Sequence, residues 1–327
     1  MRVAVLGAGG AIGGHLVRAL LDEGHELVPV DIKAPGDWWQ WADEDADDAS
    51  PYAGYDLSDP ELAHWVVEDC DEVYNLACQM GGIGFITHEP YRCMRSTAIN
   101  IAVLDACIAQ GRPVRYFYSS SACVYPQDLQ HDPKVSPLRE IDAYPADPEP
   151  GYGEEKLYGE RLAQVVGADP RNQVTTRIAR YHNVFSSPGS WNDGREKAPA
   201  AICRKVAEAK MSGSGVIDIW GDGTATRSYM DVADAVAGTL AVMRSDHDGP
   251  LNVGSDRLVS VDELVSVVEG IAGVSLTRRY DPTAPRGVAG RNSDNTLCQI
   301  ATGWSPSVAL EDGLARLYGW IEDQLRA

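Results

Sequence analysis

Two segments of the chain carry residue types suited to oxidising an alcohol. Tyr152 and Lys156 are four residues apart, so a helix would place the phenol and the ammonium on one face. A cation beside a tyrosine lowers the tyrosine pKa, which lets the phenolate accept a hydroxyl proton as hydride leaves the same carbon. Exposed Tyr and Lys at this spacing are common, but here they follow an apolar run that ends in Ser119–Pro126. The two segments together predict reversible oxidation of a hydroxyl group.

Hydride transfer needs an acceptor, and the first glycines predict a dinucleotide site. Gly7, Gly10 and Gly13 follow an apolar strand pattern and open a helical one, where backbone amides can reach a pyrophosphate. Asp31 closes the next strand, where its carboxylate would accept hydrogen bonds from the adenosine ribose and repel a 2′-phosphate. We therefore predict NAD as the cofactor, with Lys33 close enough to soften the preference over NADP. The alternative is that the glycines form only a tight turn.

Apolar runs and helical patterns alternate through the first half of the chain, which predicts βαβ units and a parallel sheet. The fold class is therefore α/β, a Rossmann-type doubly wound parallel sheet with a smaller C-terminal lobe. The predicted strands are Val3–Leu6, Glu26–Val30, Glu72–Leu76, Arg115–Tyr118, Thr175–Ile178 and, later, Leu251–Gly254. The predicted helices include Ile12–Glu23, Thr97–Gln110 and Gly153–Val166.

Two irregular stretches interrupt this alternation. Lys33–Tyr55 contains Pro, Gly, three Trp and an acidic run, and we expect the Trp side chains to pack locally rather than bind a cofactor. Ser186–Lys197 is rich in Gly, Ser and Asn, as is typical of a functional loop or a lobe boundary. We expect residues 1–183 and 228–256 to form the NAD-binding domain, and residues 184–227 and 257–327 to form a smaller substrate-binding lobe.

Composition limits the partners and the compartment. The formal net charge of −20 argues against binding nucleic acid or an anionic membrane, so a phosphate-bearing ligand must be met by local Arg and Lys. Seven cysteines without a CxxC pair fit neither a disulfide framework nor a zinc site. No signal-peptide pattern or long apolar run is present, and we expect a soluble cytoplasmic protein without a metal.

The motifs resemble those of the extended short-chain dehydrogenases/reductases. In that class the position of Ser121 holds the reacting alcohol, and Asp56, Leu57, Leu76, Ala11 and Ile12 would line the cofactor site. Many 4-epimerases of the class carry Thr where this chain has Cys123. A thiol can carry protons near neutral pH if a nearby cation lowers its pKa. The alternative is a small buried cysteine without chemistry.

A closer resemblance is to the GDP-mannose 3,5-epimerases, and it covers nearly the whole chain. It rests on Gly194–Lys205, Cys78–Phe85, Trp220–Gly223, Thr226–Ser228 and Gly290–Asn295. It implies that Cys123 and Lys197 exchange protons at C3 and C5 of a hexose. The resemblance to the extended short-chain class also implies a homodimer, paired through Thr97–Gln110 and Gly153–Val166 in a four-helix bundle. The residues implied to contact the sugar or its diphosphate are Gly81, Gly82, Asn183, Lys205, Arg227 and Arg291.

The resemblance implies an NAD-dependent isomerase. Tyr152, Lys156 and Ser121 would oxidise C4 of GDP-mannose, and the 4-keto sugar would be inverted at C3, C5 or both to give GDP-L-galactose or GDP-L-gulose. Alternatives are a nucleotide-sugar 4-epimerase, which needs neither Cys123 nor Lys197, and a non-catalytic NAD-binding scaffold. Ala225 replaces the Gln of the family, and Arg95 and Ser96 replace two Asn, which leaves the exact substrate open.

Overall fold

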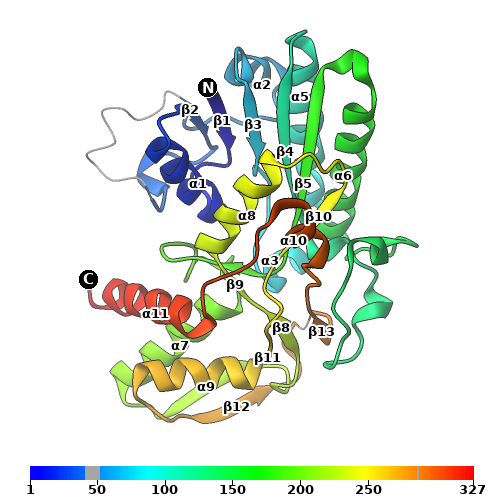
Figure 1. Ribbon diagram of the computed structural model, residues 1–327. Helices are drawn as coiled ribbons and strands as arrows, with labels where there is room; N and C mark the ends of the chain where they lie inside the picture. The colour runs from blue at the N-terminus through cyan, green and yellow to red at the C-terminus, as the bar shows by residue number, and fades with distance from the viewer. Residues whose placement is uncertain (41–51, 286) are drawn as a thin grey trace.

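A six-stranded parallel sheet forms the centre of the larger lobe (Figure 1). The computed structural model describes residues 1–40, 52–285 and 287–327. The strands lie side by side in the order β2, β1, β3, β4, β5, β10, which is doubly wound. The predicted strands are all confirmed, with these bounds: β1 (Arg2–Leu6), β2 (Glu26–Val30), β3 (Glu72–Asn75), β4 (Val114–Ser121), β5 (Val174–Tyr181) and β10 (Pro250–Val253).

Helices cover both faces of this sheet because alternate residues of each strand point to opposite sides. Val3 and Val5 of β1 pack in one apolar cluster with α1 and α8, whereas Ala4 and Leu6 pack in another with α2, α5 and α6. The three predicted helices are confirmed within two residues at each end. The bounds are α1 (Ala11–Asp22), α2 (Pro60–Val67), α5 (Ser96–Ala109), α6 (Tyr152–Ala168) and α8 (Val232–Arg244).

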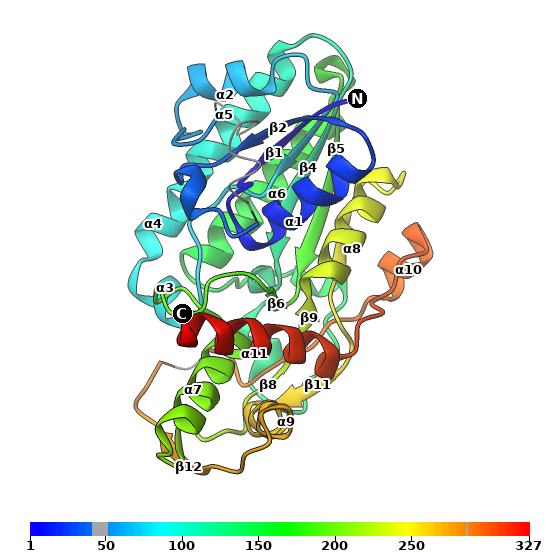
Figure 2. The same ribbon diagram turned by 90° about the vertical axis from the view of Figure 1, so that its left-hand side faces the viewer.

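The smaller lobe lies below the sheet in Figures 1 and 2. Its core joins α7 (Ala198–Ser212), α9 (Val261–Ala272) and α11 (Leu310–Arg326) to the strand pair β7 (Val216–Trp220) and β12 (Thr277–Asp281). Short strands and helices make up the rest of the described fold. They are β6 (Val184–Phe185), β8 (Thr226–Ser228), β9 (Met230–Asp231), β11 (Leu258–Ser260), β13 (Gly290–Arg291), α3 (Ile83–His88), α4 (Pro90–Met94) and α10 (Thr296–Thr302).

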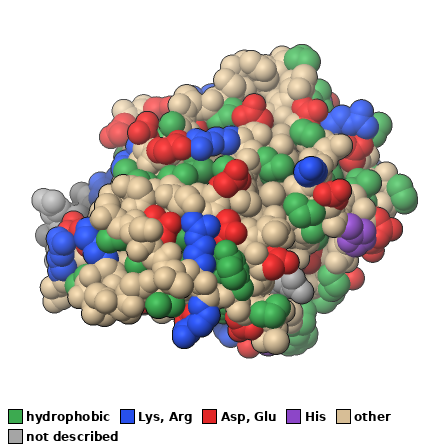
Figure 3. All heavy atoms as spheres, turned by 90° about the horizontal axis from the view of Figure 1, so that it is seen from below, with side chains coloured by type: hydrophobic (Ala, Val, Ile, Leu, Met, Phe, Trp, Pro, Cys, Tyr) green, Lys and Arg blue, Asp and Glu red, His purple; other side chains and the backbone are tan. Residues whose placement is uncertain are grey.

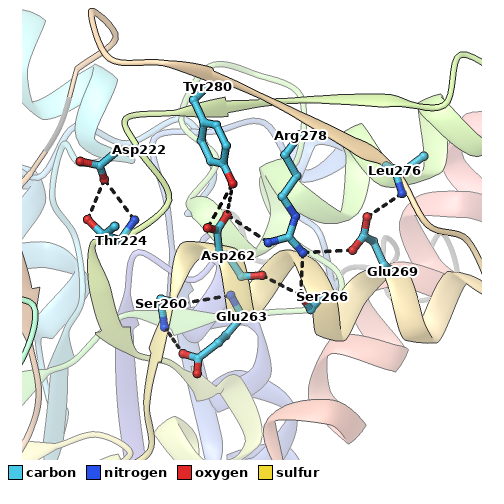
Figure 4. A network of polar contacts seen from close by, with 10 residues as sticks. All are labelled: Asp222, Thr224, Ser260, Asp262, Glu263, Ser266, Glu269, Leu276, Arg278 and Tyr280. Atoms are coloured by element: carbon cyan, nitrogen blue, oxygen red, sulfur yellow. Dashed lines mark hydrogen bonds and ion pairs between the residues drawn. The ribbon is translucent and has the colours of Figure 1, made fainter.

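A polar network fixes the loop that follows β7 (Figure 4). Asp262 at the start of α9 accepts a hydrogen bond from Tyr280 of β12 and forms an ion pair with Arg278 at 3.1 Å. Its backbone amide donates to the Gly223 carbonyl, and a Cβ on Gly223 would lie 2.4 Å from the Asp262 carboxylate. The loop Trp220–Gly223 is therefore held directly against α9.

Charged side chains of both signs are interspersed on the lower face of the molecule (Figure 3). Ion pairs such as Arg278 with Glu269 and Arg257 with Glu311 account for part of this mixture in the smaller lobe. Among the helices of the described ranges, none combines the length and the apolar character that crossing a membrane requires.

The segment Lys33–Gln40 lies across the glycine-rich loop. Trp38 is 5% exposed, and a Cβ on Gly9 would lie 2.6 Å from its ring. Trp39 packs edge-on against Trp320 of α11, and Gln40 donates a hydrogen bond to the Pro188 carbonyl. Trp38 therefore packs locally on the glycine-rich loop, whereas Trp39 packs against the distant helix α11. The third Trp and most of the acidic run belong to residues 41–51, outside the described residues.

Candidate active site

The glycine-rich loop forms a tight turn between β1 and α1. Gly7 has a φ of 87°, and its carbonyl lies where a side chain on Gly13 would begin, 2.1 Å from an added Cβ. The turn therefore requires both glycines, and it brings the loop to the N-terminus of α1 at Ala11 and Ile12. This cradle fits the pyrophosphate of a dinucleotide.

Asp31 and Lys33 brace the same loop. The Asp31 carboxylate accepts hydrogen bonds from the backbone amides of Gly9 and Lys33, both at 2.9 Å. The Lys33 ammonium donates to the Gly9 carbonyl at 2.9 Å. A lysine engaged in this way is held against the loop, and Asp31 keeps the position from which a ribose hydroxyl would be bound. The site residues therefore fit NAD.

The other expected cofactor residues lie along the next two loops. Asp56 is exposed and accepts a hydrogen bond from the Ser58 amide, which holds the pKa of its carboxyl below the usual range. Leu57 is buried in the apolar cluster under β2 and α2. Leu76 continues β3, and its carbonyl carbon lies 2.9 Å from a Cβ added to Gly7.

Tyr152 and Lys156 meet on α6 beside Ser121, as expected. The Lys156 ammonium lies 5.7 Å from the centre of the Tyr152 ring, and both residues are buried. Burial raises the pKa of Tyr152 well above its ordinary value, and Cys78, Cys123 and Glu155 add to this, while a hydrogen bond with Ser121 acts the other way. The lowering expected from Lys156 is thus wrong for this structure. The main reason is burial of the phenol, and Glu155, 3.6 Å from the Lys156 ammonium, adds to it.

Cys123 lies directly after β4 in the same cluster as Tyr152. Nη1 of Arg291, on β13, donates to its sulfur at 3.2 Å. Arg291 also forms an ion pair with Glu149 at 3.6 Å and donates to the buried side chain of Gln130. Burial raises the pKa of the Cys123 thiol, and Glu149 raises it further while Arg291 lowers it. Burial and Glu149 therefore outweigh the lowering of the thiol pKa that was expected from a nearby cation.

Lys197 comes to this cluster from the smaller lobe, at the residue that precedes α7. Burial lowers the pKa of its ammonium, whereas Cys123 and Cys78 lie close enough to raise it. Gly82 places this segment, because its amide donates to the Arg195 carbonyl at 2.9 Å and a Cβ would lie 2.4 Å from the Glu196 carbonyl. Gly81 likewise leaves room for Phe85.

The remaining expected substrate residues are distributed over a wider area. The Arg227 guanidinium donates to the Thr226 and Val288 carbonyls, and burial beside Arg291 lowers its pKa to about 10. Asn183, in a left-handed conformation with a φ of 45°, donates to the Ser228 carbonyl. Lys205 is set apart from the Cys123 cluster, with its ammonium 5.7 Å from the Trp220 ring centre and bonded to the Asp218 carbonyl.

Sequence reasoning missed four residues that surround the thiol and the two lysines. Gln130 and Glu149 hold Arg291, Arg195 lies 4.4 Å above the Phe85 ring, and the Cys78 thiol forms a hydrogen bond with Lys156. Gln130 is fully buried although it lies in a polar one-turn helix (Gln127–Gln130), and no residue spacing indicates this. Cys78 falls within a segment already singled out for its glycines.

The fold and this cluster together define a Rossmann-type enzyme class, and the chain belongs to the NAD dependent epimerase/dehydratase family, whose model matches residues 3–254. It is 38% identical to GDP-mannose 3,5-epimerase 1 of Oryza sativa subsp. japonica, over 99% of this chain and 82% of that protein. It is 37% identical to GDP-mannose 3,5-epimerase of Arabidopsis thaliana, over 99% and 83%. The resemblance expected from the motifs is confirmed.

Solved structures agree on the fold. UDP-glucose 4-epimerase of Thermotoga maritima, solved with UDP-glucose, has a TM-score of 0.85 at 23% identity, covering 99% of this chain and all of that one. UDP-glucuronic acid 4-epimerase of Bacillus cereus, solved with UDP-glucuronic acid and NAD, has a TM-score of 0.80 at 24% identity, with the same coverage.

Proposed function

We propose that the chain is an NAD-dependent isomerase that epimerises GDP-mannose at C3, C5 or both, giving GDP-L-galactose or GDP-L-gulose. One observation carries this proposal: Cys123 from the larger lobe and Lys197 from the smaller lobe converge beside Tyr152. A 4-epimerase needs only the tyrosine. The relatives named GDP-mannose 3,5-epimerase, aligned over nearly the whole chain, support the substrate.

In this proposal the residues divide into two groups. Tyr152, with Ser121 and Lys156, takes the proton of the C4 hydroxyl and later returns it. NAD held at the glycine-rich loop would supply a reversible hydride acceptor for C4, so that none would be consumed over a turnover. The C4 carbonyl acidifies the hydrogens at C3 and C5, because the resulting carbanion is delocalised onto oxygen.

Cys123 and Lys197 then remove and return protons at these two carbons from opposite faces of the ring. Burial lowers the pKa of Lys197, which increases the share of free amine near neutral pH and suits it to accept a proton. Burial of the Cys123 thiol keeps it protonated, which suits it to donate one. Lys197 is thus suited to accept a proton first, and Cys123 is suited to donate one first.

We assign substrate contacts to Arg227, Arg291, Asn183, Lys205, Gly81 and Gly82. Buried guanidinium groups suit a diphosphate because each binds its oxygens in a bidentate manner. Arg227 and Arg291 lie close enough to lower the Arg227 pKa, and a diphosphate would neutralise this pair of like charges. Lys205 and Trp220 lie apart from the Cys123 cluster, and we expect the nucleoside end of a substrate to extend toward them.

We also propose a cytoplasmic homodimer whose two lobes divide as the sequence predicts except at α10, which packs with the larger lobe. All seven cysteines are free, as suits a reducing compartment. Helices α5 and α6 pack side by side and expose Ile101, Tyr158 and Val165, which suits pairing with a second copy. The assignment of α10 to the larger lobe follows from packing, because Cys298 of α10 and the nearby Trp304 pack with Val253 in the core of that lobe.

Solvent deuterium tests the proposed reaction. GDP-mannose incubated with the protein and NAD in deuterated water is expected to gain deuterium at C3 or C5 and to yield a new hexose, both measured by NMR. A 4-epimerase would form product without label at these carbons, and a non-catalytic scaffold would form no product. Either result contradicts the proposal.

A further inference from the structure

Glu155 is a buried carboxylate beside Lys156 that the proposed reaction does not use. Its side chain is fully buried, as is that of Lys156, and Oε2 lies 3.6 Å from the Lys156 ammonium. Oε1 accepts hydrogen bonds from Nδ2 of Asn100 at 2.7 Å and from the Tyr118 hydroxyl at 3.2 Å. Burying a carboxylate is costly unless it is paired and hydrogen-bonded. Both conditions are met here, which indicates that the charge has a role.

The surroundings of the ammonium indicate what this role is. Tyr118 of β4 and Tyr152 of α6 present their rings to it at 5.1 and 5.7 Å, and the Cys78 thiol after β3 forms a hydrogen bond with it. Ser121, Cys123, Cys93 and Lys197 are further ionisable or polar groups near this pair. Glu155 is the carboxylate that forms an ion pair with the ammonium, whereas Glu160, the next acidic residue of α6, is paired with Arg180. Oε2 has no hydrogen-bond partner in the described part of the chain, and its ion pair with the ammonium is the contact that balances its charge.

We propose that Glu155 is a positioning residue that holds the Lys156 ammonium and thereby sets the pH range in which Tyr152 and Lys156 oxidise C4. This inference rests on the part of the proposed function that assigns C4 oxidation to these two residues. The carboxylate stabilises the protonated lysine and disfavours the phenolate nearby. Without it, the pKa of Lys156 and the pKa of Tyr152 should both fall.

The variant Glu155→Gln removes the charge but keeps an acceptor for Asn100 and Tyr118. We expect both the acidic and the basic limb of kcat/KM to move to lower pH, by on the order of one unit, since an ion within 4–6 Å has an effect of this size. KM for the sugar and the NAD content of the purified protein should change less than about twofold, because a change in the pKa of the pair leaves binding contacts in place. Glu154→Gln is the matched control, since Glu154 is exposed on the same helix; its profile should not move.

A merely structural role would lower the rate at every pH and leave both limbs in place, which would overturn the inference. Should Glu155→Gln fail to fold in a thermal melt, Glu155→Asp decides, because it keeps the charge but withdraws it by one methylene. It should shift both limbs in the same direction by less, and unmoved limbs would overturn the inference. The profile needs only C4 oxidation, so it can be measured with any nucleotide-sugar that is turned over, even if deuterium does not enter C3 or C5.

Discussion

At the scale of single residues, proton transfer depends on groups that burial has pushed away from their ordinary ionisation. The Cys123 thiol is held in its protonated form by burial and Glu149, while Arg291 at 3.2 Å favours the thiolate. Lys197 is shifted the other way, toward the free amine. Two carriers with opposite tendencies suit the removal of a proton from one face and its delivery to the other.

The thiol itself should be essential for inversion. Cys123→Ala should reduce formation of the epimerised product at least about 100-fold, the usual effect of losing a general acid or base. Oxidation of C4, followed as reduction of the bound NAD by absorbance, should persist because Tyr152 and Lys156 are intact. Cys93→Ala is the control, since Cys93 is buried in the same apolar cluster. Equal losses in the two variants would contradict a chemical role for Cys123.

The two charges beside Cys123 should shift its reactivity in opposite directions. Arg291→Gln removes a group that lowers the thiol pKa, so alkylation of Cys123 at a fixed pH should become slower. Glu149→Gln removes one that raises the pKa, so alkylation should become faster, because the thiolate is the reacting form. Mass spectrometry of the Cys123 peptide measures both rates, with the Cys298 peptide as reference. Shifts of the same sign in both variants would show that access, and not charge, controls the thiol.

At the scale of elements, glycines determine how close the two lobes approach. Gly82→Ala would place a methyl group 2.4 Å from the Glu196 carbonyl, one residue before Lys197. We expect product formation to fall roughly tenfold or more, since a shift of about 1 Å in a catalytic group is costly, while the melting temperature changes little. Gly84→Ala is the control, because its nearest neighbour would be 3.8 Å away. If both variants retain full activity, the position of Lys197 does not depend on this contact.

The elements themselves were largely predictable from sequence, and the electrostatics of the site was not. The strands follow from apolar runs, because a sheet covered on both faces buries mainly apolar side chains. Buried polar residues such as Asn75 in β3 and Arg180 in β5 depart from this pattern. The contacts around Cys123 are not local: Arg291 is 168 residues away in the chain, Gln130 ends a one-turn helix (Gln127–Gln130), and Glu149 lies in a loop. The sequence therefore indicated a cation near Cys123, but it did not indicate the burial, which affects the thiol pKa more than the cation does.

At the scale of the whole molecule, the apolar side chains left exposed on α5 and α6 predict a dimer. Light scattering should give twice the mass of one chain, and Val165→Glu together with Tyr158→Glu should give a monomer, since burying these charges in an interface is costly. Ile300→Glu is the control, because Ile300 is 77% exposed on α10, outside this surface. A monomeric mass for the unaltered protein would refute the pairing.

The central claim is that a thiol and an amine face the hexose from opposite sides. A crystal structure of the Tyr152→Phe variant with NAD and GDP-mannose tests it most directly, because this variant should bind both ligands without turnover. We predict that the Cys123 sulfur and the Lys197 nitrogen lie on opposite faces of the ring, each about 3.5 Å from C3 or C5. If either atom lies on the same face as the other, or beyond reach of both carbons, the proposed inversion is contradicted.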